Sequence, residues 1–382
     1  MTSTSLTVVN YVFDTNLRSP EALLARYDAL TEWCRAVART GVRVRLVQAY
    51  ARDTAFLADG VEWVFRQSGS AHPHQIGRLH RSVLEHAADV VHVNGIETVV
   101  QTWLLRRALP ETTALVVQHH GGAPPRSQLS AIAKRALMRD IDGFLFTSLT
   151  QADDWVAGGL LARERVHEVL EASSGLYPVN REDARERTGM HGLPAILWVG
   201  RLVPNKDPLT VLRAFFLSAD RLPGSTLTMI FQDAQMLKDV QQEIAAHPAA
   251  ASRVRLIGEV PHHEMSAWYS AADVFVLGSA SEVCGYAALE ACACGAVPVL
   301  SDIPAFRAVT GEGQIGRLWT RGDADACADA LVEACAQLPA GRARVASHFE
   351  AHLSWDAVAR RACDIYAQVR ERRCRARDHE VA

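Results

Sequence analysis

The chain has 382 residues, of which 49% are hydrophobic and 22% are charged, and its formal net charge at pH 7 is −3. This length exceeds the usual size of one domain, so we expect two domains, and the nearly balanced charge gives no indication of a nucleic-acid partner. The sequence has no apolar run long enough to span a membrane, and its N-terminus does not resemble a signal peptide, so we expect a cytoplasmic protein.

The eight cysteines are scattered, mostly among alanines in segments with helical character. No C-x-x-C pair occurs, and Cys292 and Cys294 are two positions apart on a predicted helix, so their side chains point to different faces. We therefore expect buried free thiols and no zinc site.

The first half of the chain alternates between apolar runs and segments with helical periodicity. Its predicted strands are residues 6–13, 42–47, 88–95, 114–122 and 143–148. Its predicted helices are residues 21–40, residues 96–108 and a helix that ends at Met138. Short connections from strand to helix to strand are typical of a parallel α/β sheet.

A break rich in Ser, Gly, Pro and charged residues covers about residues 172–192, and the alternating pattern then begins again. The predicted strands of the second half are residues 195–200, 226–231, 254–257, 274–277 and 297–300. Its predicted helices are residues 207–216, 326–336 and 355–370. The sequence therefore predicts two α/β units, and such units bind ligands at the carboxyl ends of their strands.

The most informative stretch follows the predicted strand that ends at Leu277. Glu282 lies in a turn, Gly285 precedes a helical segment, and Glu290 lies on that helix. The start of a helix carries free N–H groups and a partial positive charge, so it can receive a phosphate. A carboxylate beside that position is better suited to accept hydrogen bonds from sugar hydroxyls. The alternative is that both glutamates are solvated or capping residues.

Residues 200–207 leave the first strand of the second half as a loop that contains two cations, Arg201 and Lys206. Together with the start of the next helix, these cations could hold a diphosphate and stabilise it as it leaves. The alternative is a basic solvated loop.

Two histidine pairs occur. His119 and His120 end a predicted strand and precede two glycines, which favours a functional position, although a structural histidine is an equal alternative. His262 and His263 follow Pro261, and because neighbouring residues rarely share a metal, we interpret this pair as part of a surface loop.

Three further patterns have simpler interpretations. Residues 311–316 match G-x-G-x-x-G but follow no strand and open no helix, so we expect a loop and no dinucleotide site. Asp323 and Asp325 resemble a metal-binding pair but lead directly into a helix, so helix capping is the better account. The basic stretch at residues 126–139 could contact a membrane surface, but a solvated helix face is favoured.

Four segments together resemble the family 4 glycosyltransferases, which are retaining enzymes with a GT-B fold. The segments are residues 198–202, 205–209, 256–260 and 281–299. In the last segment Glu282 and Glu290 match the family's E-x7-E motif, and Gly285 stands at its expected place. The resemblance is specific over about residues 190–310 and looser on both sides.

The resemblance implies an α/β GT-B architecture of two facing Rossmann-like domains with a cleft between them. The first, on the acceptor side, would cover residues 1–175. The second, which would bind the nucleotide sugar, would cover residues 190–354, and a C-terminal helix at residues 355–382 would return to the first domain.

The resemblance also assigns roles to single residues. Arg201 and Lys206 would bind the donor diphosphate, Glu282 would hydrogen-bond the transferred sugar, and Glu290 would hold the ribose hydroxyls. His120 would lie near the reacting carbon, with His119 as the alternative. The remaining donor-binding residues lie in the matching segments: Gly200, Val260, Cys284 and Gly285.

The implied reaction is transfer of a sugar from a nucleotide-diphosphate sugar, preferably a UDP-sugar, to an acceptor with retention of anomeric configuration and without a metal or other cofactor. The acceptor would be a sugar, another small molecule, or a glycan or lipid-linked molecule. Residues 14–20 depart from the glycine-rich loop common in the family, so the acceptor is not identified. A nucleotide-sugar epimerase and an inactive donor-binding protein are the alternatives.

Overall fold

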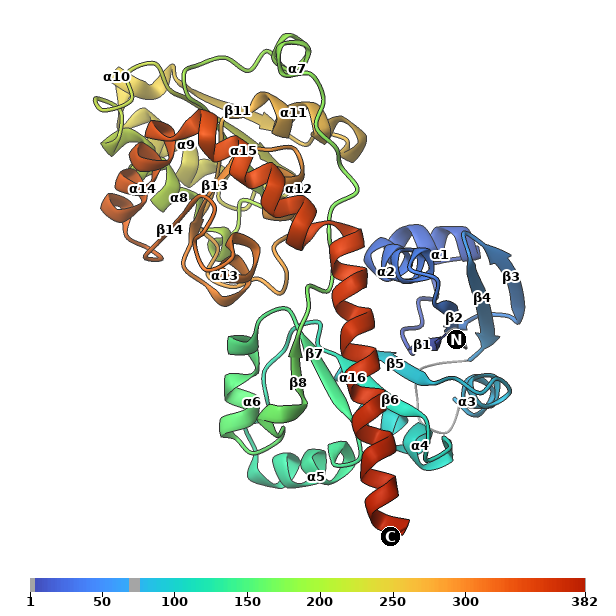
Figure 1. Ribbon diagram of the computed structural model, residues 1–382. Coiled ribbons are helices and arrows are strands. Elements are labelled where there is room, and N and C mark those ends of the chain that lie inside the picture. The colour runs from blue at the N-terminus through green and yellow to red at the C-terminus, as the bar shows by residue number, and fades with distance from the viewer. Residues whose placement is uncertain (1–3, 69–75, 382) are drawn as a thin grey trace. The chain divides into compact units, whose positions relative to one another are not determined.

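The computed structural model describes residues 4–68 and 76–381 (Figure 1). The chain divides into two compact units. The first consists of Met1–Ala172 together with Trp355–Ala382, and the second of Ser173–Ser354. Each unit contains its own sheet with helices packed against it.

The sheet of the first unit has eight strands in the order β3-β4-β2-β1-β5-β6-β7-β8. Their bounds are β1 Ser5–Asn10, β2 Arg43–Tyr50, β3 Thr54–Ala58, β4 Val61–Gln67, β5 Val90–Asn94, β6 Ala114–Gln118, β7 Gly143–Phe146 and β8 Val166–Glu168. All neighbours pair in parallel except β3 and β4, an antiparallel edge hairpin that the sequence reading did not predict. The strand order reverses between β1 and β5, which makes their carboxyl ends the topological switch point.

The helices of the first unit are α1 Pro20–Arg26, α2 Asp28–Arg39, α3 Gly77–Leu84, α4 Val99–Ala108, α5 Gln128–Met138, α6 Asp153–Ala157 and α16 Trp355–Val381. The single helix predicted over residues 21–40 is wrong, because the backbone leaves the helical region at Tyr27 (φ −107°, ψ 51°). The Thr31 hydroxyl stabilises the break by donating to the carbonyls of Leu24 (2.8 Å) and Tyr27 (3.1 Å).

The last helix, α16, packs against α2 and β6 of the first unit (Figure 1). A buried polar chain fixes this packing: Trp33 Nε1 donates to the Tyr366 hydroxyl (3.1 Å), which lies 2.8 Å from His92 Nδ1. Because the indole can only donate, the tyrosine hydroxyl accepts from it and can donate its own O–H to the histidine nitrogen. The helical pattern ends near residue 370, whereas the family resemblance implies a helix over residues 355–382, and α16 runs to Val381.

The sheet of the second unit has six strands in the order β11-β10-β9-β12-β13-β14, all parallel. Their bounds are β9 Ala195–Gly200, β10 Thr226–Phe231, β11 Val254–Gly258, β12 Val274–Leu277, β13 Val297–Ser301 and β14 Arg317–Trp319. Strands β9 to β11 follow one another in one direction, and β12 to β14 continue from the other side of β9. The switch point of this sheet is therefore the pair of carboxyl ends of β9 and β12.

The helices of the second unit are α7 Arg181–Thr188, α8 Pro208–Leu217, α9 Leu237–Ala245, α10 Pro248–Ala251, α11 Met265–Ala271, α12 Tyr286–Ala293, α13 Pro304–Thr310, α14 Ala324–Ala336 and α15 Leu338–His348. Helix α7 forms within the break expected around residues 172–192. It is held to the sheet because Arg181 and Arg185 both pair with the buried carboxylate of Asp273. Asp273 also accepts the Ala195 N–H at 2.8 Å.

The structure confirms the capping and loop interpretations. The Asp323 carboxylate accepts the Ala326 N–H at 2.9 Å and so caps α14. Gly311 ends α13, and the glycine-rich segment that follows runs as a loop into β14. All eight cysteines are free, as predicted, but only five are buried: Cys335 and Cys363 are half-buried, and Cys374 is exposed on the solvent side of α16.

The basic stretch at residues 126–139 forms α5, whose outer face exposes Leu129 and Ile132. Among the helices that the structure describes, none has both the length and the apolar character needed to cross a bilayer.

Candidate functional site

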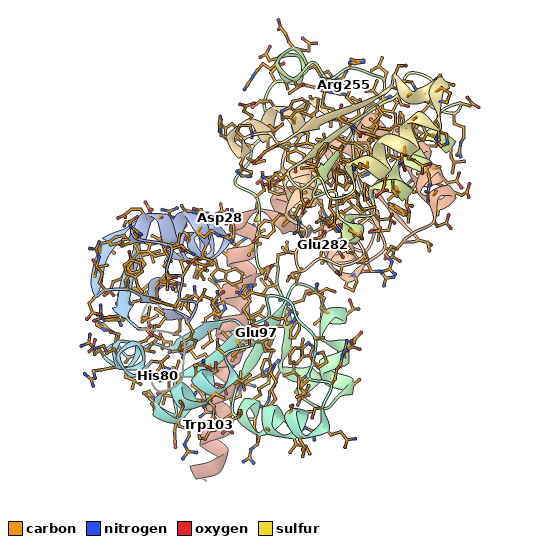
Figure 2. All side chains as sticks on the ribbon, turned by 180° about the vertical axis from the view of Figure 1, so that it is seen from behind. Asp28, His80, Glu97, Trp103, Arg255 and Glu282 are labelled. Atoms are coloured by element: carbon orange, nitrogen blue, oxygen red, sulfur yellow. The ribbon has the colours of Figure 1, made fainter. Side chains whose placement is uncertain are left out.

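Two loops meet at the switch point of the second sheet. One follows β9 and carries Lys206. The other follows β12 and carries Glu282, which is labelled in Figure 2. The Lys206 ammonium contacts the Glu282 carboxylate, and both side chains are only 15% exposed. At the end of the sheet where parallel α/β folds bind their ligands, the chain thus places a cation and an anion in contact.

Asn205 ties the same two loops together. Its side-chain amide donates to the Ser281 carbonyl (3.0 Å), and its side-chain oxygen accepts the Ser281 hydroxyl (3.1 Å). Its backbone carbonyl accepts the Ala280 N–H at 2.7 Å. These three bonds fix the positions from which Lys206 and Glu282 emerge. Sequence reasoning gave Asn205 no role, although it directly precedes Lys206.

Helix α12 begins beside this pair. Its N-cap Gly285 has a left-handed backbone (φ 79°), and a Cβ at this position would lie 2.8 Å from Phe306 Cε1. Both observations require glycine. Cys284 is buried beneath the turn. The turn therefore brings the positive end of α12 toward the Lys206–Glu282 pair, which is a suitable environment for an anion.

Glu290, one turn further along α12, is held by two side chains. The Tyr269 hydroxyl donates to Glu290 Oε2 at 2.8 Å, and His262 Nε2 lies 2.7 Å from Oε1. Burial, followed by the charge of Glu290, raises the pKa of Tyr269 well above its usual value, so this phenol stays protonated and donates. The carboxylate is therefore orientated before any ligand binds.

The sequence did not indicate the contact that His262 makes. Its ring is 69% exposed, as expected of a surface loop, yet it contacts Glu290. The loop interpretation is thus incomplete, because a fold that starts α11 directly after this loop places it against α12. No periodic pattern could have indicated that contact.

The other predicted donor-binding residues also end or follow strands of the second sheet, although β11 is separated from β9 by β10. Arg201 is exposed at the start of the loop after β9, and Val260 is half-buried after β11. A Cβ on Gly200 would lie 3.2 Å from the Trp198 ring, so glycine leaves room for this ring, whereas Lys206 Cδ, at 3.7 Å, would be at ordinary contact distance.

In the first unit the two adjacent histidines have different surroundings. His119 is buried, stacks on Phe146 with 4.5 Å between ring centroids, and lies 3.2 Å from the Gly122 carbonyl. Burial lowers its pKa. His120 is one-third exposed, and both of its ring nitrogens have oxygen neighbours at 2.5 Å, from Glu171 and Asn94. His119 is therefore a packed structural residue, whereas His120 remains accessible.

Glu97 lies in the loop between β5 and α4 of the first unit (Figure 2). Its carboxylate is near Gly95 and Gly122, where a Cβ would lie 3.4 and 3.5 Å from its oxygens.

Within residues 4–68 and 76–381, no group of three or more His, Cys, Asp and Glu side chains is arranged to hold a metal ion.

Comparison with known proteins gives matches to sugar-transferring enzymes. Residues 180–339 match the family model described as glycosyl transferases group 1. D-inositol 3-phosphate glycosyltransferase 1 of Catenulispora acidiphila is 28% identical over 380 residues, which cover 88% of this chain and 89% of that protein. D-inositol 3-phosphate glycosyltransferase of Thermobispora bispora is 31% identical over 66% of this chain and 61% of its own length.

Solved structures share the fold at low identity. A glycosyltransferase from Rickettsia africae superposes with a TM-score of 0.72 at 13% identity and covers 97% of this chain and 99% of its own. Anabaena HepE in complex with UDP superposes with a TM-score of 0.68 at 18% identity and covers 96% of this chain and 100% of its own.

Proposed function

Because the chain is a GT-B glycosyltransferase of family 4, we propose that it moves a sugar from a nucleotide-diphosphate sugar to an acceptor hydroxyl with retention of anomeric configuration. The observation that carries this proposal is the contact between Lys206 and Glu282 beside the start of α12. The positive charge of Lys206 suits the diphosphate of a donor, and the carboxylate of Glu282 suits the hydroxyl groups of its sugar.

A diphosphate would compete with Glu282 for the Lys206 ammonium. Its negative charge grows as the bond to the sugar breaks, so a cation and a helix N-terminus at this place stabilise the transition state more than the bound donor. Once Lys206 turns to the diphosphate, the Glu282 oxygen that it contacts can accept a hydrogen bond from the sugar. Exposed Arg201 is the second cation assigned to the diphosphate.

Glu290 is the residue proposed to hold the ribose. Tyr269 already donates a hydrogen bond to Glu290 Oε2. A ribose hydroxyl would therefore donate to Oε1, which now contacts the exposed ring of His262. We favour UDP as the nucleotide. The HepE structures contain UDP or UDP-glucose, whereas a starch synthase of the same fold was solved with ADP, which is therefore the principal competitor.

The acceptor attacks from the side on which the diphosphate leaves, and the leaving group assists, since retention then needs no covalent sugar–enzyme intermediate. The reaction is proposed to need no metal, because Lys206, Arg201 and α12 supply the positive charge. The similarity to D-inositol 3-phosphate glycosyltransferases makes cyclitol phosphates the first acceptors to test, followed by sugars and lipid-linked glycans.

The test is nucleotide release from UDP-, GDP-, ADP- and dTDP-sugars, with and without acceptors, in the presence of EDTA. We expect one donor to be turned over. Lys206→Ala should weaken nucleotide binding and lower kcat, together by at least ~100-fold in kcat/KM. Glu282→Gln should lower kcat but leave nucleotide binding equal or tighter, because it removes the competitor for Lys206.

Lys238→Ala is the matched control, since Lys238 is an exposed lysine on α9. It should behave as the wild type. Calorimetry with each free nucleotide measures binding separately from turnover. If none of the four nucleotides binds, or if Lys206→Ala and Lys238→Ala behave alike, the proposed donor site is wrong.

A further inference from the structure

A chain of polar side chains crosses the carboxyl ends of the first sheet at its switch point. It runs from Gln48 on β2 to Asn10 at the end of β1 and Asn94 at the end of β5, and we call these three residues the amide chain. It continues to His120 after β6 and Glu171 after β8. Each member has a hydrogen-bond partner, so the direction of every bond can be derived.

The direction is set at Gln48. Its Nε2 lies 2.7 Å from the Val12 carbonyl and 2.8 Å from the Ala49 carbonyl. Backbone carbonyls only accept, so the Gln48 amide nitrogen must point to them and its oxygen must face Asn10. That oxygen accepts from Asn10 Nδ2 at 2.8 Å. Asn10 Oδ1 in turn accepts the Val12 N–H at 3.3 Å, which fixes the asparagine independently.

Asn94 continues the same direction. Its Nδ2 donates to Asn10 Oδ1 at 3.5 Å, and this leaves its oxygen against His120 Nε2 at 2.5 Å. An amide oxygen only accepts, so Nε2 must carry a proton. On the other side of the ring, the carboxylate of Glu171 lies 2.5 Å from Nδ1. An ionised carboxylate also only accepts, so beside ionised Glu171 the Nδ1 atom must carry a proton as well.

The surroundings place the positive charge on this histidine. Glu171 is 8% exposed, and a carboxylate so far removed from water requires a charged or strongly donating partner. Two other histidines lie near. Burial lowers the pKa of His92 to about 3, with the charge of His120 as the next cause, and burial also lowers the pKa of His119. Both neighbours are therefore neutral at pH 7.

We propose that Glu171 and the amide chain are positioning residues that hold His120 as an imidazolium, so that it serves the bound sugar as a hydrogen-bond donor and not as a base. In the free protein Nε2–H donates to Asn94. A sugar oxygen can replace the asparagine oxygen, while Glu171 keeps the ring in place. The donor role rests on the proposed function, whereas the protonation state does not.

The protonation state is tested in the full-length protein with ¹⁵N-labelled histidine at pH 7.5. The chain has 15 histidines, so the His120 signals are assigned by their loss in His120→Gln. We expect both His120 nitrogens to resonate as protonated. An unprotonated nitrogen in the wild type would overturn the inference, whatever the activity.

Variants separate charge from packing. Glu171→Gln keeps the shape but removes the charge, so Nδ1 should become unprotonated, whereas Nε2, which faces the Asn94 oxygen, should keep its proton. Asn94→Asp combined with Glu171→Gln moves the carboxylate to the other side of the ring, and both nitrogens should become protonated again. Glu97→Gln removes a nearby carboxylate that lies toward Gly95 and Gly122, and it should leave the His120 signals unchanged. A Glu171→Gln spectrum like that of the wild type would also overturn the inference.

Activity completes the test. Glu171→Gln should lower kcat by at least ~10-fold with little change in KM for the donor, and the double variant should recover part of that loss. If the wild type turns over no donor but His120 is doubly protonated, the proposed function fails and the protonation inference stands. If donor is turned over and Glu171→Gln has normal kcat, the donor role of His120 is wrong.

Discussion

The Lys206–Glu282 contact and the His120–Glu171 contact differ in one important respect. Lys206 and Glu282 are equally exposed, so water and ligand reach both partners alike. Glu171 is nearly buried while His120 is partly open, so one partner is fixed and the other can meet a ligand. We therefore expect the first pair to separate when donor binds and the second to persist, because separating a buried carboxylate from its partner costs more free energy.

Three of the buried histidines have pKa values low enough to make stability depend strongly on pH. Burial lowers the pKa of His80 to about 4, of His92 to about 3 and of His167 to about 4. In the unfolded chain they titrate near the ordinary value of about 6.5, so below that pH the unfolded state binds more protons. The stability of the folded state that depends on these neutral rings is fully present above pH 6.5. It is lost as the pH falls toward 4.

We expect the free energy of unfolding to fall between pH 6.5 and 4, by up to about 1.4 kcal/mol per pH unit for each histidine. Urea unfolding at several pH values measures it. His80→Gln, at a site where the ring meets the Tyr11 hydroxyl at 2.8 Å, should flatten the dependence. A slope equal in both proteins would show that His80 does not contribute.

At the scale of elements, the loop between α13 and β14 shows why a glycine pattern without its structural context misleads. Gly316 has a left-handed backbone (φ 68°), and a Cβ there would lie 1.9 Å from the Pro298 carbonyl oxygen in β13. The glycine therefore permits two backbone segments to approach closely and leaves no room for a ligand.

Two substitutions in this loop should differ in effect. Gly316→Ala adds a backbone collision to left-handed strain and should destabilise by more than about 3 kcal/mol, mainly by displacing β14. Gly313→Ala has the strain (φ 82°) but only an ordinary contact at 3.8 Å, so about 1 kcal/mol is expected. Chemical denaturation of both variants compares them, and equal losses would contradict the close-approach explanation.

Hydrophobic patterning predicted the elements that pack into a core, and the wholly buried strands β10 and β12 occur at the predicted residues. It failed where a single side chain determines where a helix breaks or where a helix is held. Thr31 makes a break between α1 and α2, and Asp273 holds α7 inside a segment that reads as a linker. The lysine and glutamates of the proposed donor site could be singled out in the sequence because their spacing is local.

The sequence patterns did not indicate the residues that hold these side chains and His120 in place. Asn205 reads as an ordinary loop residue, and Glu171 follows a strand, β8, of only three residues. Both act through partners far away in the sequence: Ser281 for Asn205, and His120 for Glu171. Such pairings depend on the order of the strands in the sheet, and that order cannot be read from a single sequence.

At the scale of the whole molecule, the two units differ in continuity. The second is one uninterrupted segment, whereas the first needs Trp355–Ala382 in addition to Met1–Ala172. Without α16, Trp33 and His92 would lose their hydrogen-bonded partner Tyr366 and the apolar cover around it.

Fragments should therefore behave differently. Residues 173–354 should fold alone, with a cooperative thermal transition and dispersed NMR signals. Residues 1–172 should be unfolded or molten, and co-expression with residues 355–382 should restore cooperative unfolding. Circular dichroism and NMR measure both. A cooperatively folded 1–172 fragment would show that α16 is dispensable for that core.

The position of α16 also affects the order of events on the ribosome. A nascent chain emerges from its N-terminus, yet the first unit cannot close its core until the last helix has been synthesised. The second unit, complete at Ser354, can fold while the earlier half still exposes apolar strands. During synthesis, the half that emerges first is thus the half that depends longest on protection from aggregation.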